Sequence, residues 1–323
     1  MIPGLIAQPM NALEVRLHEL VQSEVEFIQL IGEDLVNAGG KRARPQLVFL
    51  AARALGNPDA REVDFAACIE LLHSASLLHD DLVDDAETRR GHEAAFRHYG
   101  NAVSVLSGDY LLSRLMEILA GFGTDAASYV QLVAKTARQI CEGEVLQFQV
   151  AALETYSFEN YETIITGKTA ALAAAACKGA AMLSGASQEV IAALELYGLE
   201  YGRAFQIQDD LLDLTSSAEK LGKPIGGDLR EGKATLPVLY LFQADITEAR
   251  DIIARRASKD GDVELMRELA NKPIQHGKSA IELSKLEIHR RCEIAVAALE
   301  KLPASPARKI LEELAWKETE RVA

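Results

Sequence analysis

The sequence has few cysteines and no long apolar run, and each shortage excludes a class of protein. Its four cysteines are Cys68, Cys141, Cys177 and Cys292. They lie far apart with no CxxC pair, which argues against a zinc site or a disulfide framework and fits a reducing cytosol. No apolar run reaches the ~18 to 20 residues that a membrane span needs. No basic segment followed by an apolar one marks a secretory signal near the N-terminus, so we expect a cytoplasmic protein.

Basic residues are also in short supply. The chain of 323 residues carries 34 Lys and Arg against 48 Asp and Glu, a formal net charge of −14. Because phosphate binding needs a basic face, this balance disfavours nucleic acid as the main partner. An acidic protein still binds an anion where metal ions bridge the two.

Helical periodicity is present almost everywhere. Apolar residues recur at helical spacing, as in the stripe from Leu13 to Leu35, whose helix is expected to end at Gly39 and Gly40. Alternating strand patterns and hairpin signals are scarce. The longest break is the stretch 216–235, rich in Gly and Lys, and no low-complexity linker or repeat is present. The sequence therefore predicts an all-α fold, with residues 1–323 as one helical bundle around a central cavity.

Two acidic clusters with the pattern DDxxD, at residues 80–84 and 209–213, are the main candidates for chemistry. On a helix, residues four apart lie on the same face, so Asp80 and Asp84 point two carboxylates in one direction. Asp209 and its partner four residues later do the same. Leu, Val and Ile flank both clusters and draw the carboxylates toward a low-dielectric wall, which disfavours their charge.

A divalent cation would offset that charge. Mg²⁺ prefers oxygen ligands and typically takes one or two carboxylates together with substrate phosphates. One DDxxD cluster is as often a solvated acidic helix face, but two clusters beside apolar stripes favour metal binding. The loop signature of an EF-hand, with its central glycine, is missing, which argues against a dedicated calcium site.

Basic side chains complete a diphosphate site in this interpretation. They lie in four places: the run GGKRARP at 39–45, Arg89 and Arg90 just past the first cluster, Lys168 with Thr169 at an expected helix start, and Lys223 and Lys233 in the glycine-rich stretch. Lys and Arg suit an anion held by charge-assisted hydrogen bonds, and a helix start adds free backbone N–H groups. Taken singly, each is more often a surface cation. Together they predict two anion sites, one bridged by metal and one purely basic.

The ordered motifs GGKRARP, HSASLLHDDLVDDAETRRG, GKTA, FQIQDDLLD and GKPIGGDLREGK resemble those of the trans-prenyl diphosphate synthases. The resemblance runs from about Leu13 to the C-terminus, and residues 302–315 are similar to the long-chain, octaprenyl-type bacterial members. It implies an isoprenoid synthase-like fold. It also implies a Mg²⁺-dependent prenyltransferase that condenses isopentenyl diphosphate with farnesyl or geranyl diphosphate into an all-trans polyprenyl diphosphate.

The resemblance also assigns roles to individual residues. Asp80, Asp84, Asp209 and Asp213 would hold two or three Mg²⁺ ions that bridge the allylic diphosphate, and Asp81 and Asp210 would support the metals or their waters. Arg89, Lys168, Thr169, Gln206, Lys223 and Lys233 would contact the allylic diphosphate, while Lys41, Arg44, His73 and Arg90 would bind isopentenyl diphosphate. The aspartates at 80, 81, 84, 209 and 210, with Lys168, would be the catalytic set. Taken alone, His73 is more often a core histidine.

Product length would follow from the residues four and five positions before Asp80, which are Ser76 and Ala75. Both are small, whereas short-chain relatives often carry an aromatic residue there. An open apolar channel stabilises each CH₂ of a growing tail, so we expect about six to ten isoprene units. The candidates for closing the channel are Leu112, Leu115, Met116, Leu119, Leu146 and Phe148.

Four alternatives remain. A farnesyl or geranylgeranyl synthase would share these motifs. A class I terpene cyclase usually lacks a second DDxxD and has an aromatic cavity, whereas aromatic residues are only 6% here. A non-catalytic regulatory subunit would have lost some of the motifs. A catalytic subunit of a heterodimer stays open beside the commoner homodimer. The exact product length, the primer and the downstream pathway are not fixed by the sequence.

Overall fold

The computed structural model describes residues 4–85, 88–89, 92–217 and 225–321. Within this part of the chain most residues are helical, and strands occur only as two short antiparallel pairs. These are β1 (Thr88–Arg89) with β2 (His92–Glu93), and β3 (Pro273–Gln275) with β4 (Lys278–Ser279). The predicted all-α fold class is confirmed. No described helix has the length and apolar character to cross a membrane.

The chain divides into two compact units, each described by itself. The first unit holds residues 1–138, 172–195 and 301–311, and the second holds 139–171, 196–300 and 312–323. Several elements contribute residues to both: α7 (Ala126–Leu153), α9 (Ala171–Leu183), α10 (Gln188–Thr215), η4 (Leu299–Lys301) and α17 (Pro306–Glu320). That residues 1–323 form a single domain remains a prediction.

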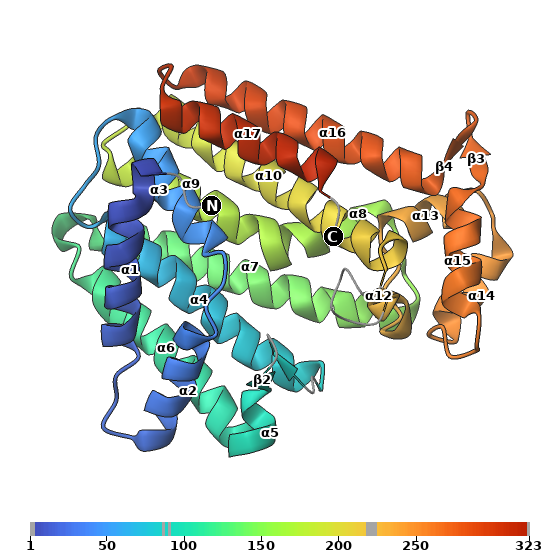
Figure 1. The fold of residues 1–323 in the computed structure, drawn as a ribbon, viewed down its shortest axis with the longest axis horizontal. Coiled ribbons are helices and arrows are strands. Elements are labelled where there is room, and N and C mark those ends of the chain that lie inside the picture. Colours follow the sequence, from blue (N-terminus) through green and yellow to red (C-terminus); the bar gives the residue numbers. More distant parts are fainter. Residues whose placement is uncertain (1–3, 86–87, 90–91, 218–224, 322–323) are drawn as a thin grey trace. The chain divides into compact units, whose positions relative to one another are not determined.

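The first unit is built around α4. Its other elements are η1 (Gly4–Ile6), α1 (Ala7–Leu20), α2 (Glu26–Asn37), α3 (Ala43–Leu55), α5 (Ala95–Tyr99), α6 (Asn101–Ala120) and η2 (Gly123–Asp125). Helix α4 (Glu62–Val83) packs against α1, α3, α5 and α6 (Figure 1). Every residue from 65 to 72 is at most 4% exposed. A helix segment buried on all sides needs neighbours around it, which explains the central position of α4.

The expected first helix is two helices. The apolar stripe continues through both, but the chain leaves the helical conformation between α1 and α2. There the Ser23 hydroxyl accepts a hydrogen bond from the backbone N–H of Val25, 3.1 Å away. Such a local bond competes with the helix, so the prediction of one uninterrupted helix was wrong. The predicted end at the glycine pair is confirmed, because α2 ends at Asn37.

The second unit has its core around α13 (Leu236–Gln243). Its other elements are α8 (Phe158–Ile165), the π-helical turn η3 (Thr166–Ala170), α12 (Gly227–Arg230), α14 (Thr247–Ala254), α15 (Asp262–Asn271) and α16 (Ala280–Ala298). Helix α13 packs against α14, α15 and α16, beside the β3–β4 hairpin (Figure 1). Ser279 and Glu282 form a capping box that starts α16 directly after this hairpin.

Candidate active site

The first aspartate motif occupies the last turn of α4. Asp81 is 4% exposed, Asp80 is half-buried, and Asp84 is the exposed C-cap residue, whose N–H donates to the Asp80 carbonyl at 2.8 Å. The C-terminal end of a helix carries a partial negative charge, which disfavours carboxylates. A cation bound beside these three aspartates would therefore stabilise their negative charge.

The GGKRARP run lies between α2 and α3, and its three cations differ. Arg42 is 6% exposed and donates to Glu14, to Glu70 and to the Val36 carbonyl. Its backbone has a positive φ of 45°. Arg42 thus joins α1, α2 and α4, so the prediction that all three cations suit an anion was wrong for this one. Lys41 is exposed and Arg44 half-buried, as a binding role requires.

The residues predicted to set product length lie on α4 before the first motif. Ala75 is 1% exposed, whereas Ser76 is half-buried and donates through its hydroxyl to the His73 carbonyl at 2.8 Å. His73 is half-buried as well. Of the candidates for closing a channel, Leu115 and Leu119 are buried, and Met116 and Phe148 are 55% and 44% exposed. The two exposed side chains are poor candidates for an internal floor.

The second aspartate motif lies near the C-terminal end of α10, and its members differ in surroundings. The Asp209 side chain is 51% exposed, whereas Asp210 and Asp213 are 7% and 4% exposed. Asp213 Oδ2 accepts the N–H of Asp228 at 3.1 Å, and its carbonyl accepts the N–H of Gly226 at 3.0 Å. Asp213 therefore holds the start of α12, and Asp209 is the carboxylate of this motif open to solvent.

Asp210 is the centre of a buried hydrogen-bond network in the second unit. The Tyr161 hydroxyl donates to Asp210 Oδ2 at 2.7 Å, and Gln206 Nε2 donates to Oδ1 at 2.8 Å. The Thr169 hydroxyl in turn donates to Gln206 Oε1 at 2.6 Å. Both oxygens of Asp210 are thus engaged by the protein. The carboxylate fixes the orientation of Gln206, and Gln206 fixes that of Thr169, two predicted diphosphate contacts.

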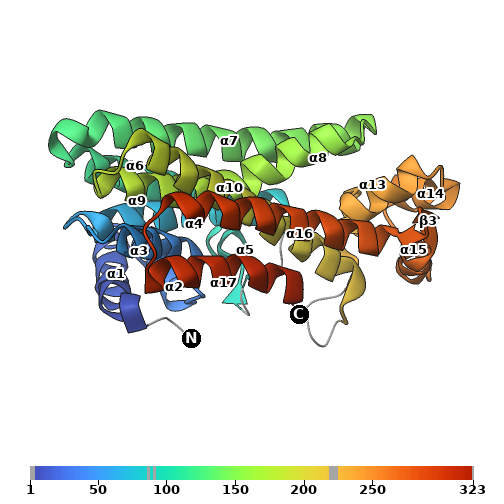
Figure 2. The ribbon, with the colours of Figure 1, turned by 90° about the horizontal axis from the view of Figure 1, so that it is seen from above.

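Lys168 lies in the π-helical turn η3, which joins α8 to α9 without a break. The prediction of a helix start with free N–H groups was therefore wrong. What places Lys168 is a backbone contact: a Cβ on Gly167 would come within 3.1 Å of the Gly143 Cα in α7. Figure 2 shows α8 alongside this end of α7. Lys168 Nζ lies 2.6 Å from Glu144 Oε2 and 3.2 Å from Gln147 Oε1, which hold the ammonium toward α7.

A cavity of about 100 Å³ brings the polar groups of the second unit together. Lys168, Lys233, Gln206, Asp210 and Asp228 line it, with Tyr, Ile and Leu side chains on its other walls. Burial raises the pKa of Asp210 to about 6, against the opposing hydrogen bonds from Tyr161 and Gln206. Burial, with the charges of Asp210 and Asp213, raises the pKa of Asp228 to about 8. Two raised carboxyl pKa values beside two lysines indicate a site that takes up further positive charge.

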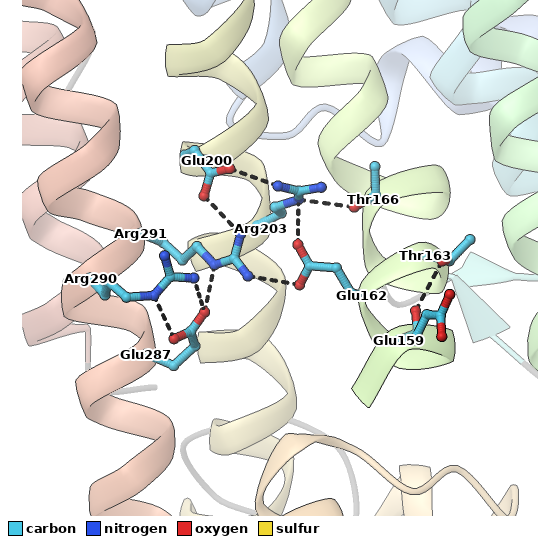
Figure 3. Close-up of polar contacts among 9 residues, drawn as sticks. All are labelled: Glu159, Glu162, Thr163, Thr166, Glu200, Arg203, Glu287, Arg290 and Arg291. Carbon is cyan, nitrogen blue, oxygen red and sulfur yellow. Dashed lines mark hydrogen bonds and ion pairs between the residues drawn. The ribbon is translucent and has the colours of Figure 1, made fainter. Parts of the chain in front are cut away.

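An ion-pair network joins the helices that carry the cavity residues (Figure 3). Arg203 pairs with Glu162 at 3.0 Å and Glu200 at 2.7 Å, and it donates to the Thr166 hydroxyl at 2.9 Å. Arg291 of α16 pairs with the same two glutamates at 2.9 and 3.0 Å. The network therefore ties α8, α10 and α16 together one turn away from Lys168 and Gln206.

Within the first unit lie Asp80, Asp81, Asp84, Lys41, Arg44, His73, Ala75 and Ser76, and within the second lie Lys168, Thr169, Gln206, Asp209, Asp210, Asp213 and Lys233. In the second set, Gln206 joins Thr169 to Asp210, and Lys168 and Lys233 line the same cavity as Gln206 and Asp210. Arg90 and Lys223 lie outside the described residues, as does the side chain of Arg89. That Asp80 faces Asp209 across a shared diphosphate stays a prediction.

A sequence model of the polyprenyl synthetase family matches residues 25–270. The chain belongs to this family. The octaprenyl diphosphate synthase of Escherichia coli (strain K12) is 37% identical over 317 residues, covering 97% of this chain and 96% of that protein. Heptaprenyl diphosphate synthase component 2 of Geobacillus stearothermophilus is 36% identical over 313 residues, covering 97% and 95%.

A solved structure agrees. The crystal structure of a polyprenyl synthase from Caulobacter crescentus CB15, complexed with calcium and isoprenyl diphosphate, matches with a TM-score of 0.88 at 37% identity, covering 99% of this chain and 96% of that one. The resemblance, the enzyme class and the isoprenoid synthase fold predicted from the motifs are confirmed. This polyprenyl synthetase is a trans-prenyltransferase.

The donor set of this polyprenyl synthetase fits a divalent cation. Among the described residues no group of three or more His, Cys, Asp and Glu side chains is arranged to hold a metal ion alone. Mg²⁺ in phosphate chemistry typically takes only one or two carboxylates, with phosphates and waters as the remaining ligands. Asp80 with Asp84 in the first unit, and Asp209 in the second, each offer one or two carboxylates that reach solvent, and each matches that pattern by itself.

The sequence motifs did not predict several residues that lie around the site. Asp228 stands within the quoted motif GGDLREGK, and Tyr161 lies seven residues, about two helical turns, before Lys168. The place of Asp228 in the motif, and of Tyr161 two turns before Lys168, could have indicated both residues. Glu144 and Gln147 have no such signal, because their contact with Lys168 depends on the meeting of Gly143 and Gly167.

Proposed function

We propose that this polyprenyl synthetase is a Mg²⁺-dependent, cytoplasmic enzyme that condenses isopentenyl diphosphate with farnesyl or geranyl diphosphate into an all-trans long-chain polyprenyl diphosphate. The observation that carries the proposal is the cavity where Lys168 and Lys233 meet the Asp210 network. Relatives that cover nearly the whole chain are named octaprenyl and heptaprenyl diphosphate synthases. The Caulobacter structure holds calcium and an isoprenyl diphosphate, which supports a divalent cation and this substrate class.

The chain's own residues would bind and orient the allylic diphosphate. Lys168 and Lys233 would exchange their present partners, Glu144 and Glu231, for phosphate oxygens. Thr169 and Gln206, oriented through Asp210, would fix the position of the same group. Asp80, Asp84 and Asp209 would hold two or three Mg²⁺ ions, which supply positive charge to the departing diphosphate. Lys41, Arg44 and His73 would bind isopentenyl diphosphate.

The reaction then follows from charge. The bond between the allylic carbon and the diphosphate oxygen breaks, and the electron pair leaves with diphosphate, whose charge the lysines stabilise. The double bond of isopentenyl diphosphate attacks the allylic carbon to form the new carbon–carbon bond. This leaves a cationic carbon on isopentenyl diphosphate, and the released diphosphate would take a proton from the carbon next to it. Water would trap the cationic carbon, so the apolar walls contributed by Ile164, Ile165 and Leu239 serve to exclude it.

The first test is incubation of the purified chain alone with labelled isopentenyl diphosphate, farnesyl diphosphate and Mg²⁺, followed by sizing of the product. We expect a polyprenyl product that EDTA abolishes. A product of farnesyl or geranylgeranyl length would replace the long-chain assignment with the shorter one. No product from the chain alone, but product on addition of a second subunit, would favour the heterodimer.

The aspartate assignment has its own test. Asp80→Asn and Asp209→Asn keep the side-chain shape but remove the charge, so each should lower turnover at least about a hundredfold, the scale of losing one electrostatic contact to a transition state. Asp85→Asn is the matched control, since Asp85 is exposed just past the motif and its φ of 51° is one that Asn adopts. Circular dichroism checks that helicity is kept. Activity retained in either motif variant would refute its metal role.

A further inference from the structure

The end of α17 is attached to the second aspartate motif. Arg321 Nη2 lies 2.5 Å from Asp209 Oδ1, and Nη1 lies 3.2 Å from Glu318 Oε2. The guanidinium carbon stands 4.6 Å from the centre of the Phe205 ring. The Arg321 carbonyl also accepts a hydrogen bond from Gln208 Nε2 at 2.6 Å. One arginine therefore contacts three residues within a single turn of α10.

These contacts hold Arg321 in a defined place. Gln208 and Glu318 are each 6% exposed, so the groups that position the arginine are themselves fixed. The planar guanidinium stacks on an aromatic face and joins two carboxylates, a geometry that Lys would not reproduce.

The charge around Asp209 explains what the arginine does there. Asp209 shares two turns of α10 with Asp210 and Asp213, so three carboxylates of like charge lie on neighbouring positions of one helix. A cation at Asp209 relieves this repulsion. In the structure that cation is the guanidinium of Arg321.

We propose that Arg321 is an internal counter-cation of the second aspartate motif, and that a divalent cation binding at Asp209 displaces it and releases the end of α17. The inference rests on the proposed function, because it takes Asp209 as a metal ligand. It adds a residue that no motif of the sequence contains. It also couples metal binding to the position of the C-terminal segment.

The displacement is energetically accessible. The side chains of Asp209 and Arg321 are 51% and 27% exposed, and ion pairs with that much solvent are weak. A divalent cation carries twice the charge of a guanidinium and approaches a carboxylate oxygen more closely. Solvent exposure of Asp209 leaves a route by which the ion reaches it.

The chain carries a built-in probe of this release. Its single tryptophan, Trp316, lies on α17 five residues before Arg321, and its ring centre is 5.1 Å from that of His289 on α16. Freeing the last turn of α17 would change the surroundings of that ring. Tryptophan fluorescence thus reports on the segment without a label and without turnover.

The experiment titrates the full chain with Mn²⁺ in the presence of inorganic pyrophosphate, and follows Mn²⁺ binding by electron paramagnetic resonance alongside Trp316 fluorescence. Arg321→Gln removes the competing charge and Arg290→Gln is the control, since Arg290 pairs with Glu287 on the exposed side of α16. We expect Arg321→Gln to bind Mn²⁺ about two- to fivefold more tightly, the range that an exposed ion pair represents. Its fluorescence should no longer respond to Mn²⁺, whereas the wild type and Arg290→Gln should respond along their binding curves.

Equal or weaker Mn²⁺ binding by Arg321→Gln would overturn the inference, as would the same fluorescence response as in the wild type. Asp209→Asn should abolish the fluorescence response in the otherwise unchanged chain; a response that survives it would place the coupled metal site elsewhere and also overturn the inference. Hydrogen exchange on the wild type gives a measurement free of variants, because amides of residues 317–321 should exchange faster with Mn²⁺ and pyrophosphate. If the wild type binds no Mn²⁺ and makes no product, the proposed function fails. If it does both and Arg321 has no effect, only this inference fails.

Discussion

Asp209 and Asp210 are neighbours in the sequence with opposite surroundings. Adjacent positions on a helix point about 100° apart, so one aspartate faces solvent and the other faces α8. Asp209 is open to a cation, whereas both oxygens of Asp210 accept hydrogen bonds from Tyr161 and Gln206. The same residue type therefore serves two purposes in one motif, and burial decides which.

Tyr161→Phe tests the positioning role of this network. It removes the hydroxyl that donates to Asp210 and leaves one buried carboxylate oxygen without that donor. We expect a loss of about 1–3 kcal/mol in the free energy of unfolding, measured by urea denaturation, because an unsatisfied buried acceptor costs that much. Turnover should also fall, since Gln206 and Thr169 lose their orientation.

Tyr110→Phe is the control for this change, because the Tyr110 hydroxyl donates to the Gln22 carbonyl at an exposed position in the first unit. It should alter unfolding by less than about 1 kcal/mol and leave turnover unchanged. Equal stability and turnover in Tyr161→Phe and the wild type would show that Asp210 needs no such donor.

Ser76 and Ala75 give a paired test of product length. Ser76 is half-buried, whereas Ala75 is only 1% exposed. Ser76→Phe should shorten the product, read by chromatography, with little loss of stability. Ala75→Phe should overpack the core and destabilise the chain by about 1–3 kcal/mol. An unchanged product from Ser76→Phe would place the channel on another face of α4.

Among whole elements, α8, α10 and α16 depend on the charges between them. Arg291 is 11% exposed in its side chain and pairs with Glu162, Glu200 and Glu287 (Figure 3). Removing one member of a buried ion-pair group leaves uncompensated charge. Arg291→Met should therefore lower the free energy of unfolding by about 3–5 kcal/mol, measured by urea denaturation.

The neighbouring residue is a matched control for that change. Arg290 has a half-exposed side chain and pairs with Glu287 alone among the described contacts. Arg290→Met should cost less than about 1 kcal/mol, since exposed pairs contribute little. Similar losses in the two variants would mean that the network does not hold the three helices together.

The sequence predicted the elements better than it predicted their contacts. The glycine pair at 39–40 predicted the end of α2, and the loop after α10 begins where expected, at Ser216. The stripe from Leu13 to Leu35 concealed a break, because apolar spacing continues through a turn that Ser23 stabilises by a local hydrogen bond. Periodicity reports which face is buried, not whether the backbone stays helical.

The candidate site was predictable where residues share one helix. A spacing of four residues on one helix is enough to predict that Asp80 lies near Asp84 and Gln206 near Asp210. Tyr161 with Asp210 and Arg321 with Asp209 are 49 and 112 residues apart, and no local rule brings such residues together. Arg42 shows the opposite kind of error. Its place in the sequence beside Lys41 and Arg44 suggested an anion-binding role, but it is buried and donates to Glu70, which is a structural role.

For the molecule as a whole, the open question is what covers its exposed apolar side chains. Leu106 and Met116 on α6 are 61% and 55% exposed, although most of the Leu residues that the structure describes are buried. Large exposed apolar patches are typical of an association surface, and α6 contributes two exposed apolar side chains of its own. A homodimer through α6 is the expectation that accounts for them, and a separate partner subunit is the alternative.

Leu106→Glu separates these two assemblies. A carboxylate buried at a subunit interface loses its hydration. If the homodimer forms through α6, we expect the wild type to sediment as a dimer at micromolar concentrations and the variant as a monomer. Leu286→Glu on α16 makes the same change at a position 48% exposed and should leave the dimer intact. A dimer that survives Leu106→Glu would put the interface on another face. A wild type that is monomeric and makes no product until a second subunit is added would establish the heteromeric enzyme, because the exposed face of α6 would then await a different chain.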